Sequence, residues 1–205
     1  MRVAFDLDGV LADFAGAYGA VARRRLPRPA NSVLGLSESG PPNGAASPAL
    51  ERRIWRDIES TENFWTTLDP LEPELIASVH DRAAEGGWDI FFVTQRPATA
   101  GDSVQRQTQC WLADQGFPLP SVIVHRSSRG RLAAALELDF LVDDTVAHCV
   151  DVLDLSRTKP IFVCRKPDPV AETNAERLGI ATCRSATEAL DVIVHEQADR
   201  SSGRP

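Results

Sequence analysis

The sequence predicts an α/β fold built on a mainly parallel sheet with helices on both faces. From residue 73 onward, short apolar segments alternate with segments of helical character, the order that repeating strand–helix units produce. The runs Ile90–Val93 and Val122–Val124 are apolar throughout rather than at every second position. Continuous apolar strands are typical of sheets that are covered on both sides. These observations favour a Rossmann-like sheet, in which a site lies beyond the carboxyl ends of the strands.

The individual elements follow from the apolar positions and from the residues that start and stop helices. Pro73 and Glu74 begin a helix that Gly86 and Gly87 end, and Gly116 and Gly179 close two later helices. Strands are expected to end at Asp6 and to span 89–94, 121–125, 140–142 and 160–164. Helices are expected at 14–25, 49–65, 73–86, 103–115, 130–137, 146–153, 170–178 and 187–195.

Residues 14–70 interrupt this alternation and predict a small, mostly helical cap inserted after the first strand. Within the cap, residues 27–48 are rich in Pro, Gly, Ser, Asn and Ala, a composition that predicts a loop. The core domain would then comprise residues 1–13 and 71–198. Residues 199–205 are polar, and we expect them to form a flexible tail.

Composition excludes several classes of protein. The chain has 205 residues and a formal net charge of −7, whereas surfaces that bind nucleic-acid polymers are usually basic. The N-terminus enters a strand without a basic and apolar leader, and no apolar run reaches the length of a membrane span. The four cysteines form no Cys-x-x-Cys pair, so neither a zinc site nor a disulfide framework is indicated. We expect a cytoplasmic protein with reduced thiols, for which a homodimer is an open alternative to a monomer.

The segment Asp6-Leu7-Asp8-Gly9 carries the clearest chemical signal. Residues two apart on a strand project to the same side, so the two carboxylates are held together where an apolar strand ends. Their repulsion is relieved by a cation, and oxygen ligands suit a hard divalent ion such as Mg²⁺. The alternative is an ordinary turn, because Asp and Gly are both turn formers.

Other strand ends carry residues that would complete such a site. Thr94 closes the second strand, and Asp143 and Asp144 follow the strand at 140–142. Arg129 begins the helix before that strand. If the strands are parallel neighbours, the carboxylates, the hydroxyl and the cation gather at one edge of the sheet. Together they make a Mg²⁺ and phosphate site by chemistry alone.

With these residues in this order, the chain resembles the haloacid dehalogenase-like (HAD) superfamily of phosphatases over essentially its whole length. The four motifs of that superfamily correspond to Asp6-Leu7-Asp8-Gly9, Thr94, Arg129 and Asp143-Asp144. Within the superfamily, the segment Phe5–Phe14 is similar to the deoxyribonucleotidase branch, which includes the cytosolic type C 5'-nucleotidases. Phe64-Trp65 to Pro70 is similar to that branch as well.

The resemblance implies a role for each motif residue. Asp6 would be the nucleophile that forms an aspartyl-phosphate, and Asp8 the general acid and then the general base. The second Asp favours hydrolysis over preservation of the phosphoenzyme. Asp6, the main-chain carbonyl of Asp8 and Asp144, with Asp143 close by, would bind Mg²⁺. Thr94 would donate to a phosphate oxygen, and Gln95 and Arg129 would bind the phosphate with it.

Two departures from the motifs affect the assignment. The third motif is normally a Lys, and its place falls on Arg129, with Arg131 as the alternative. An Arg holds phosphate bidentately but has a different shape. Gln95 follows Thr94 where the nucleotidase branch has Ser, so the phosphate-binding segment looks more like that of a generic phosphatase.

The substrate is therefore a small phosphorylated metabolite or a nucleotide. A (deoxy)nucleoside 5'-monophosphate is the leading expectation from the resemblance. Phe14 matches an aromatic that contacts the base in the deoxyribonucleotidase branch, and Trp65 would line the cap side of the pocket. Packing in the core is the alternative role for both aromatics. The alternative functions are a phosphatase for another metabolite, such as a sugar phosphate, and a weakly active protein that binds a phosphorylated ligand.

Asp13 is expected to cap a helix. The four histidines share no metal-ligand spacing and are expected to be structural or exposed.

Overall fold

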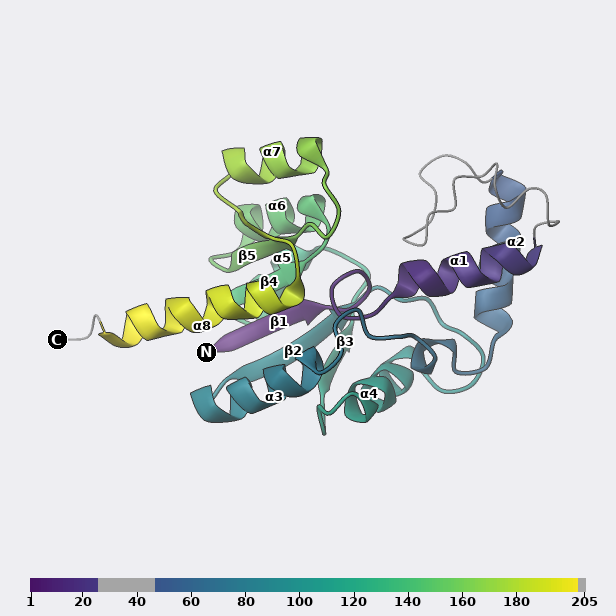
Figure 1. Cartoon of the computed structure of the whole chain (residues 1–205), viewed down its shortest axis with the longest axis horizontal. Helices are drawn as coiled ribbons and strands as arrows, with labels where there is room; N and C mark the ends of the chain where they lie inside the picture. Colours follow the sequence, from purple (N-terminus) through teal and green to yellow (C-terminus); the bar gives the residue numbers. More distant parts are fainter. Residues whose placement is uncertain (26–46, 203–205) are drawn as a thin grey trace.

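The sheet has six parallel strands in the order β3-β2-β1-β4-β5-β6 (Figure 1). The structure is a computed structural model that describes residues 1–25 and 47–202. The strands are β1 (Arg2–Asp6), β2 (Asp89–Thr94), β3 (Ser121–Val124), β4 (Phe140–Asp143), β5 (Lys159–Val163) and β6 (Ala181–Cys183). The predicted α/β class with a Rossmann-like parallel sheet is confirmed.

Helices cover both faces of the sheet. In the described residues they are α1 (Phe14–Arg25), α2 (Pro48–Ser60), the 3₁₀ helix η2 (Phe64–Thr66), α3 (Leu75–Gly86), α4 (Val104–Asp114), α5 (Arg129–Ala135), α6 (Val146–Leu155), α7 (Pro169–Arg177) and α8 (Ala186–Ser202). Figure 1 shows α3 and α8 on one side of the sheet, with α5, α6 and α7 grouped on the other.

Alternation along the strands separates the core into two layers. On β1, Val3 and Phe5 pack in one buried cluster, while Ala4 between them packs in another. The first cluster includes apolar side chains of α3, α4 and α8, and the second includes Ala133 of α5 and Val152 of α6. Both faces of β1 are therefore buried, as its unbroken apolar sequence requires.

The reversal in strand order lies between β1 and β4. The chain runs outward from β1 through β2 to β3 and then returns to place β4 on the other side of β1. At such a switch point the connections leave in opposite directions and open a crevice beyond the strands. The segments that follow Asp6 and Asp143 face that crevice.

The segment inserted after β1 lies on the side toward which β1 points (Figure 1). Its helices α1 and α2 bury Tyr18, Ala22, Ile54 and Ile58 in the large cluster. Asp13 accepts a hydrogen bond from the Gly16 amide at 2.8 Å, so it caps α1 as predicted. The loop predicted at 27–48 falls almost entirely on residues 26–46, which lie outside the described residues.

Several element boundaries differ from the sequence prediction. The helix predicted at 49–65 is divided into α2 and η2, because Thr61 is extended after Ser60 and Asn63 takes a left-handed backbone conformation with φ of 51°. Strand β6 was not predicted; it is a three-residue edge strand without an apolar run. Helix α8 extends to Ser202, so residues 199–202 are helical and not part of a tail. Nothing between Glu196 and Ser202 stops a helix, although the segment is polar.

A close contact between α5 and α6 positions Arg129. Asp151 of α6 accepts hydrogen bonds from the Gly130 amide and the Ser128 hydroxyl, both at 2.8 Å, which satisfies donors at the start of α5. The Gly130 amide holds the pKa of Asp151 below its usual range. A Cβ atom at Gly130 would lie 2.0 Å from the Asp151 carbonyl oxygen. Only glycine permits this approach.

Replacing Gly130 with alanine is expected to destabilise the protein by about 1–3 kcal/mol, because α5 must move away from α6. For a chain of this length, that corresponds to a fall in Tm of ~2–4 °C per kcal/mol, measured by thermal unfolding. The control is Arg131→Ala, which changes an exposed position on the same helix. Equal melting temperatures for wild type and Gly130→Ala would contradict the close contact.

Candidate active site

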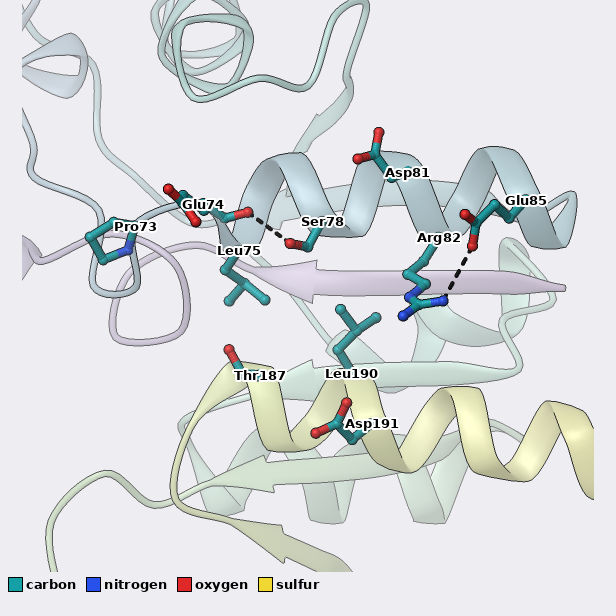
Figure 2. A pocket seen from close by; sticks show the side chains of 10 residues that line it. All are labelled: Pro73, Glu74, Leu75, Ser78, Asp81, Arg82, Glu85, Thr187, Leu190 and Asp191. Carbon is teal, nitrogen blue, oxygen red and sulfur yellow. Dashed lines mark hydrogen bonds and ion pairs between the residues drawn. The ribbon is translucent and has the colours of Figure 1, made fainter.

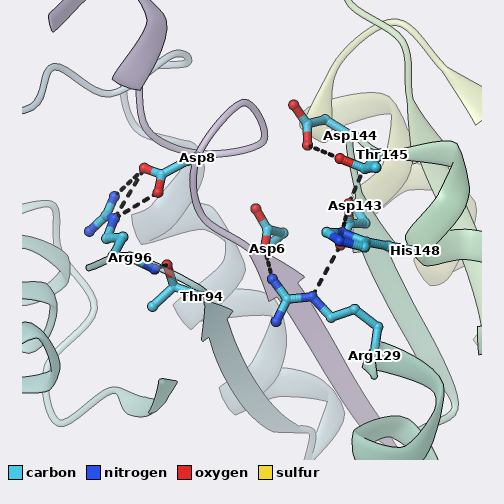
Figure 3. A network of polar contacts seen from close by, with 9 residues as sticks. All are labelled: Asp6, Asp8, Thr94, Arg96, Arg129, Asp143, Asp144, Thr145 and His148. Carbon is cyan, nitrogen blue, oxygen red and sulfur yellow. Dashed lines mark hydrogen bonds and ion pairs between the residues drawn. The ribbon is translucent and has the colours of Figure 1, made fainter. Parts of the chain in front are cut away.

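The polar residues predicted at the strand ends come together at the switch point. Asp6 and Thr94 are the last residues of β1 and β2, and Asp143 is the last residue of β4. Because β1 pairs with both β2 and β4, these three residues lie on adjacent strands. Figure 3 shows them with Asp8 and Asp144 at the same edge of the sheet. The predicted grouping of Asp6, Asp8, Thr94, Asp143 and Asp144 is therefore present.

The turn after β1 depends on Gly9. Its φ of +86° is a conformation that side-chain-bearing residues rarely adopt. A Cβ atom there would lie 1.9 Å from Asp144 Oδ2. Across this turn, the Leu7 carbonyl oxygen accepts hydrogen bonds from the Leu11 and Ala12 amides, both at 2.8 Å. The Gly9 turn therefore allows the carboxylate that follows β4 to lie directly against the loop that follows β1.

Arg129, rather than Arg131, enters the site. Its side chain is 2% exposed and forms ion pairs with Asp6 and, at 3.4 Å from Nε, with Asp143. Arg131 is exposed on the outside of α5. Arg129 Nη1 is buried and has no hydrogen-bond partner among the described residues. A buried donor without an acceptor is costly, so this group favours an anionic oxygen in the crevice.

Burial and mutual repulsion perturb two of the carboxylates. Burial raises the pKa of Asp6 well above its usual range, Asp143 raises it further, and Arg129 lowers it in part. Desolvation of its carboxylate, which packs against Gly9, raises the pKa of Asp144 to about 6, and Asp143 adds to this shift. Asp144 as a residue remains exposed on its other side. Solvent therefore screens the energetic effect of its charge.

The donor set is compatible with a divalent cation. Four carboxylates, those of Asp6, Asp8, Asp143 and Asp144, stand against the guanidinium groups of Arg96 and Arg129, which leaves a net charge of −2 when all are ionised. Carboxylate and carbonyl oxygens are the ligands that Mg²⁺ prefers. In the described part of the chain, however, no three His, Cys, Asp or Glu side chains already converge as a metal-binding group.

Arg96 is a site residue that was not predicted. Its Nη2 donates to Asp8 Oδ1 at 2.7 Å and its Nε to Asp8 Oδ2 at 2.9 Å, and its side chain is fully buried. In Figure 3 the Asp8 carboxylate points toward Arg96 and away from Asp6. Its position two residues after the strand-ending Thr94 was the only sequence signal.

His148 was expected to be structural or exposed, but it lines the site. Its Nδ1 lies 3.0 Å from both carboxylate oxygens of Asp143, and its side chain is 30% exposed. The Thr145 amide donates to Asp143 as well, at 2.9 Å. Asp143 is therefore surrounded by Arg129, His148 and this amide, which leaves Asp144 as the more available carboxylate after β4. The sequence signal that could have found His148 was its position, five residues after the strand-ending Asp143 and within the first turn of α6.

A cavity of about 240 Å³ opens onto these groups. Its polar side is formed by Asp6, Asp8, Thr94, Arg129 and Asp144, and its other side by Phe14, Trp55 and Trp65 from the inserted segment, with the exposed Gln95 at the edge. Phe14 and Trp55 stack with ring centroids 5.7 Å apart. Phe14 and Trp65, predicted to contact substrate, thus lie beside the carboxylates, and so does the predicted phosphate ligand Gln95.

The larger pockets, of about 340 to 770 Å³, lack this chemistry, and two of them border elements named above. One of about 460 Å³ lies between α3 and α8 and is lined by Glu74, Asp81, Glu85 and Asp191, with an Arg82 that pairs with Glu85 (Figure 2). Another, of about 770 Å³, lies between the Gly9 turn and residues 162–169 and is lined by Asp144 as well. Neither is lined by Asp6, Thr94 or Arg129, so the small cavity is the candidate active site.

Comparison with known proteins does not identify the chain: no protein-family model matches it, and no curated protein matches it either.

All four cysteines are free, with Cys110 exposed and the other three buried. Among the described residues, no helix is both long and apolar enough to cross a membrane.

Replacing Asp6 with Asn is expected to stabilise the metal-free protein at pH 7.5. Because the pKa of Asp6 is raised in the folded state, its stability contribution is present at low pH and is lost as the pH rises through the folded-state pKa. Asn removes the buried charge, and an increase in Tm of about 2–4 °C is expected in EDTA, as for ~1 kcal/mol in a chain of this size. The gain should shrink toward pH 4.

The matched control is Asp154→Asn, an exposed position on α6. It should leave Tm unchanged across the same pH range. Parallel Tm profiles for wild type and Asp6→Asn would show that Asp6 carries no destabilising charge.

Proposed function

We propose that this protein is a Mg²⁺-dependent phosphomonoester hydrolase that works through an aspartyl-phosphate on Asp6. The observation that carries the proposal is the convergence of a buried carboxylate, Asp6, with the unpartnered Nη1 of the buried Arg129. A nucleophile next to a buried, fixed cation suits attack on an anionic phosphoryl group. The motif order that resembles the HAD superfamily supports the same reading.

Each residue has a defined task in this reaction. An Asp6 carboxylate oxygen attacks phosphorus, and the ester P–O bond breaks as Asp8 gives a proton to the leaving oxygen. Asp8 then takes a proton from a water molecule whose oxygen attacks the phosphorus. This second attack releases inorganic phosphate and restores the Asp6 carboxylate. Thr94 and Arg129 donate hydrogen bonds to the phosphoryl oxygens throughout.

Mg²⁺ would be held by Asp6, Asp144 and the Asp8 main-chain carbonyl, with Asp143 nearby. When bound, it supplies positive charge to the phosphoryl oxygens and to the crowded carboxylates. The net charge of −2 in the cluster is the support for this assignment.

The aromatic side of the cavity favours a substrate with a planar leaving group. Phe14, Trp55 and Trp65 line the same cavity as the carboxylates, and bases stack on aromatic faces. A (deoxy)nucleoside 5'-monophosphate in the cytoplasm is therefore our leading substrate class. A sugar phosphate is the alternative, and Arg129 in place of Lys supports the third reading, a weakly active binder of phosphorylated ligands.

Hydrolysis of p-nitrophenyl phosphate with Mg²⁺ tests the reaction. Asp6→Asn is expected to lower kcat by at least ~10³-fold because it removes the nucleophile. EDTA should abolish turnover by the wild type, and the exposed control Asp154→Asn should retain it. Equal inertness of wild type and Asp6→Asn, with Mg²⁺ present, would refute the catalytic assignment.

A substrate panel tests the substrate class. Nucleoside 5'-monophosphates, deoxynucleotides, ribose 5-phosphate and glucose 6-phosphate would be compared by phosphate release. Replacing Phe14 with Leu should raise KM for nucleotides about tenfold, as expected from loss of one stacking contact, and change KM for the sugar phosphates less than twofold. No preference for any nucleotide over the sugar phosphates would rule out the nucleotidase assignment.

A further inference from the structure

Asp8 is held by a single residue in the described structure. Arg96 donates to it from Nε at 2.9 Å to Oδ2 and from Nη2 at 2.7 Å to Oδ1, with a third contact of 3.1 Å from Nε to Oδ1. A two-pronged contact fixes the plane and direction of the carboxylate as well as its distance. The Asp8 side chain is 25% exposed, so solvent reaches it from the cavity side.

Arg96 is itself fixed from two directions. Its Nη1 donates to the Thr108 hydroxyl of α4 at 3.2 Å, and its guanidinium carbon lies 4.8 Å from the centre of the Trp65 ring. The side chain has no exposed surface. With its donors engaged by Asp8 and Thr108, Arg96 is built to hold a neighbour rather than to receive a substrate oxygen, in contrast to Arg129.

The same ring connects Arg96 to the inserted segment. The Trp65 indole nitrogen donates to the Pro97 carbonyl at 3.0 Å, which ties η2 to the loop after β2. The Trp65 ring lies 5.6 Å from that of Phe14, which stacks on Trp55. A continuous row of packed rings therefore runs from α2 through Phe14 and Trp65 to Arg96, and ends at Asp8.

We infer that Arg96 is a positioning residue that sets the direction of the Asp8 carboxylate, and that it does so from a seat between Trp65 and Thr108. The inference rests on the proposed hydrolase function, in which Asp8 must reach the leaving oxygen and then a water molecule. Displacement of a reacting group by about 1 Å can lower a rate by ~10²-fold. The inserted segment would thereby act on turnover as well as on binding.

The test is a double-mutant cycle between Arg96→Lys and Asp8→Asn, read by steady-state hydrolysis of p-nitrophenyl phosphate with Mg²⁺, which gives both the rate and KM. Lysine keeps the charge but cannot make the two-pronged contact. Arg96→Lys is expected to lower the rate about 10–100-fold with less than a threefold change in KM. In the Asp8→Asn background it should have less than a twofold effect, because the residue it positions is gone.

Binding of inorganic phosphate, measured by calorimetry, separates positioning from direct binding. Arg96→Lys should change the Kd for phosphate less than threefold, whereas Arg129→Lys should weaken it at least tenfold. The control Arg106→Gln replaces an exposed arginine on α4, two residues from Thr108, and should alter neither rate nor affinity. If Arg96→Lys fails to fold, Thr108→Val removes one of the contacts that seat Arg96 and should lower the rate in the same direction.

The inference would be overturned if the double variant lost rate by the product of the two single losses, because the two residues would then act independently. A tenfold loss of phosphate affinity in Arg96→Lys would overturn it as well. A wild type that neither hydrolyses the ester nor binds phosphate would instead refute the proposed function. In that case a thermal-unfolding cycle of the same two residues decides the inference. Coupled effects on Tm would support the held geometry, and additive effects would refute it.

Discussion

The site depends on the crowding of four carboxylates at the point where the order of the sheet reverses. Parallel strands bring Asp6, Asp8, Asp143 and Asp144 to one edge, and the Gly9 turn brings Asp144 against the loop after β1. Burial, with the neighbouring charge of Asp143, raises the pKa of Asp6 and of Asp144, so ionising these two carboxylates destabilises the fold. Two buried arginines offset part of this repulsion, and each does so in a different way.

Arg129 and Arg96 divide the cluster into two halves. Arg129 lies between Asp6 and Asp143 and retains a donor without a partner, which suits it to bind an anion. Arg96 donates hydrogen bonds to Asp8 and Thr108, and its guanidinium packs against the Trp65 ring. In the proposed reaction the first arginine would bind the substrate, and the second would orient a group that acts on it. A chain optimised only for stability would not keep this residual negative charge, so its presence fits a site that is completed by a cation and a phosphoryl group.

The inserted segment and the sheet share one core. Tyr18, Ile54 and Ile58 pack in the same cluster as Phe5 and Phe92, and Trp65 is buried between that cluster and Arg96. The aromatic rings that form one wall of the cavity are thus continuous with the rings that seat Arg96. Specificity and positioning would then share the same side chains.

The sequence by itself determined the fold class, most of the strands and helices, and the strand ends that carry carboxylates. These features follow from local patterns: continuous apolar runs for buried strands, glycine and proline at helix ends, and acidic residues directly after strands. The tertiary structure decided which arginine enters the site, that Arg96 holds Asp8, and that His148 contacts Asp143. Asp8 and Arg96 are 88 positions apart, and Asp6 and Arg129 are 123 apart, so no local pattern relates them. Strand β6 and the end of α8 were not predicted for a different reason: the three residues of β6 form no apolar run, and residues 196–202 are polar, so local patterns gave no signal at either place.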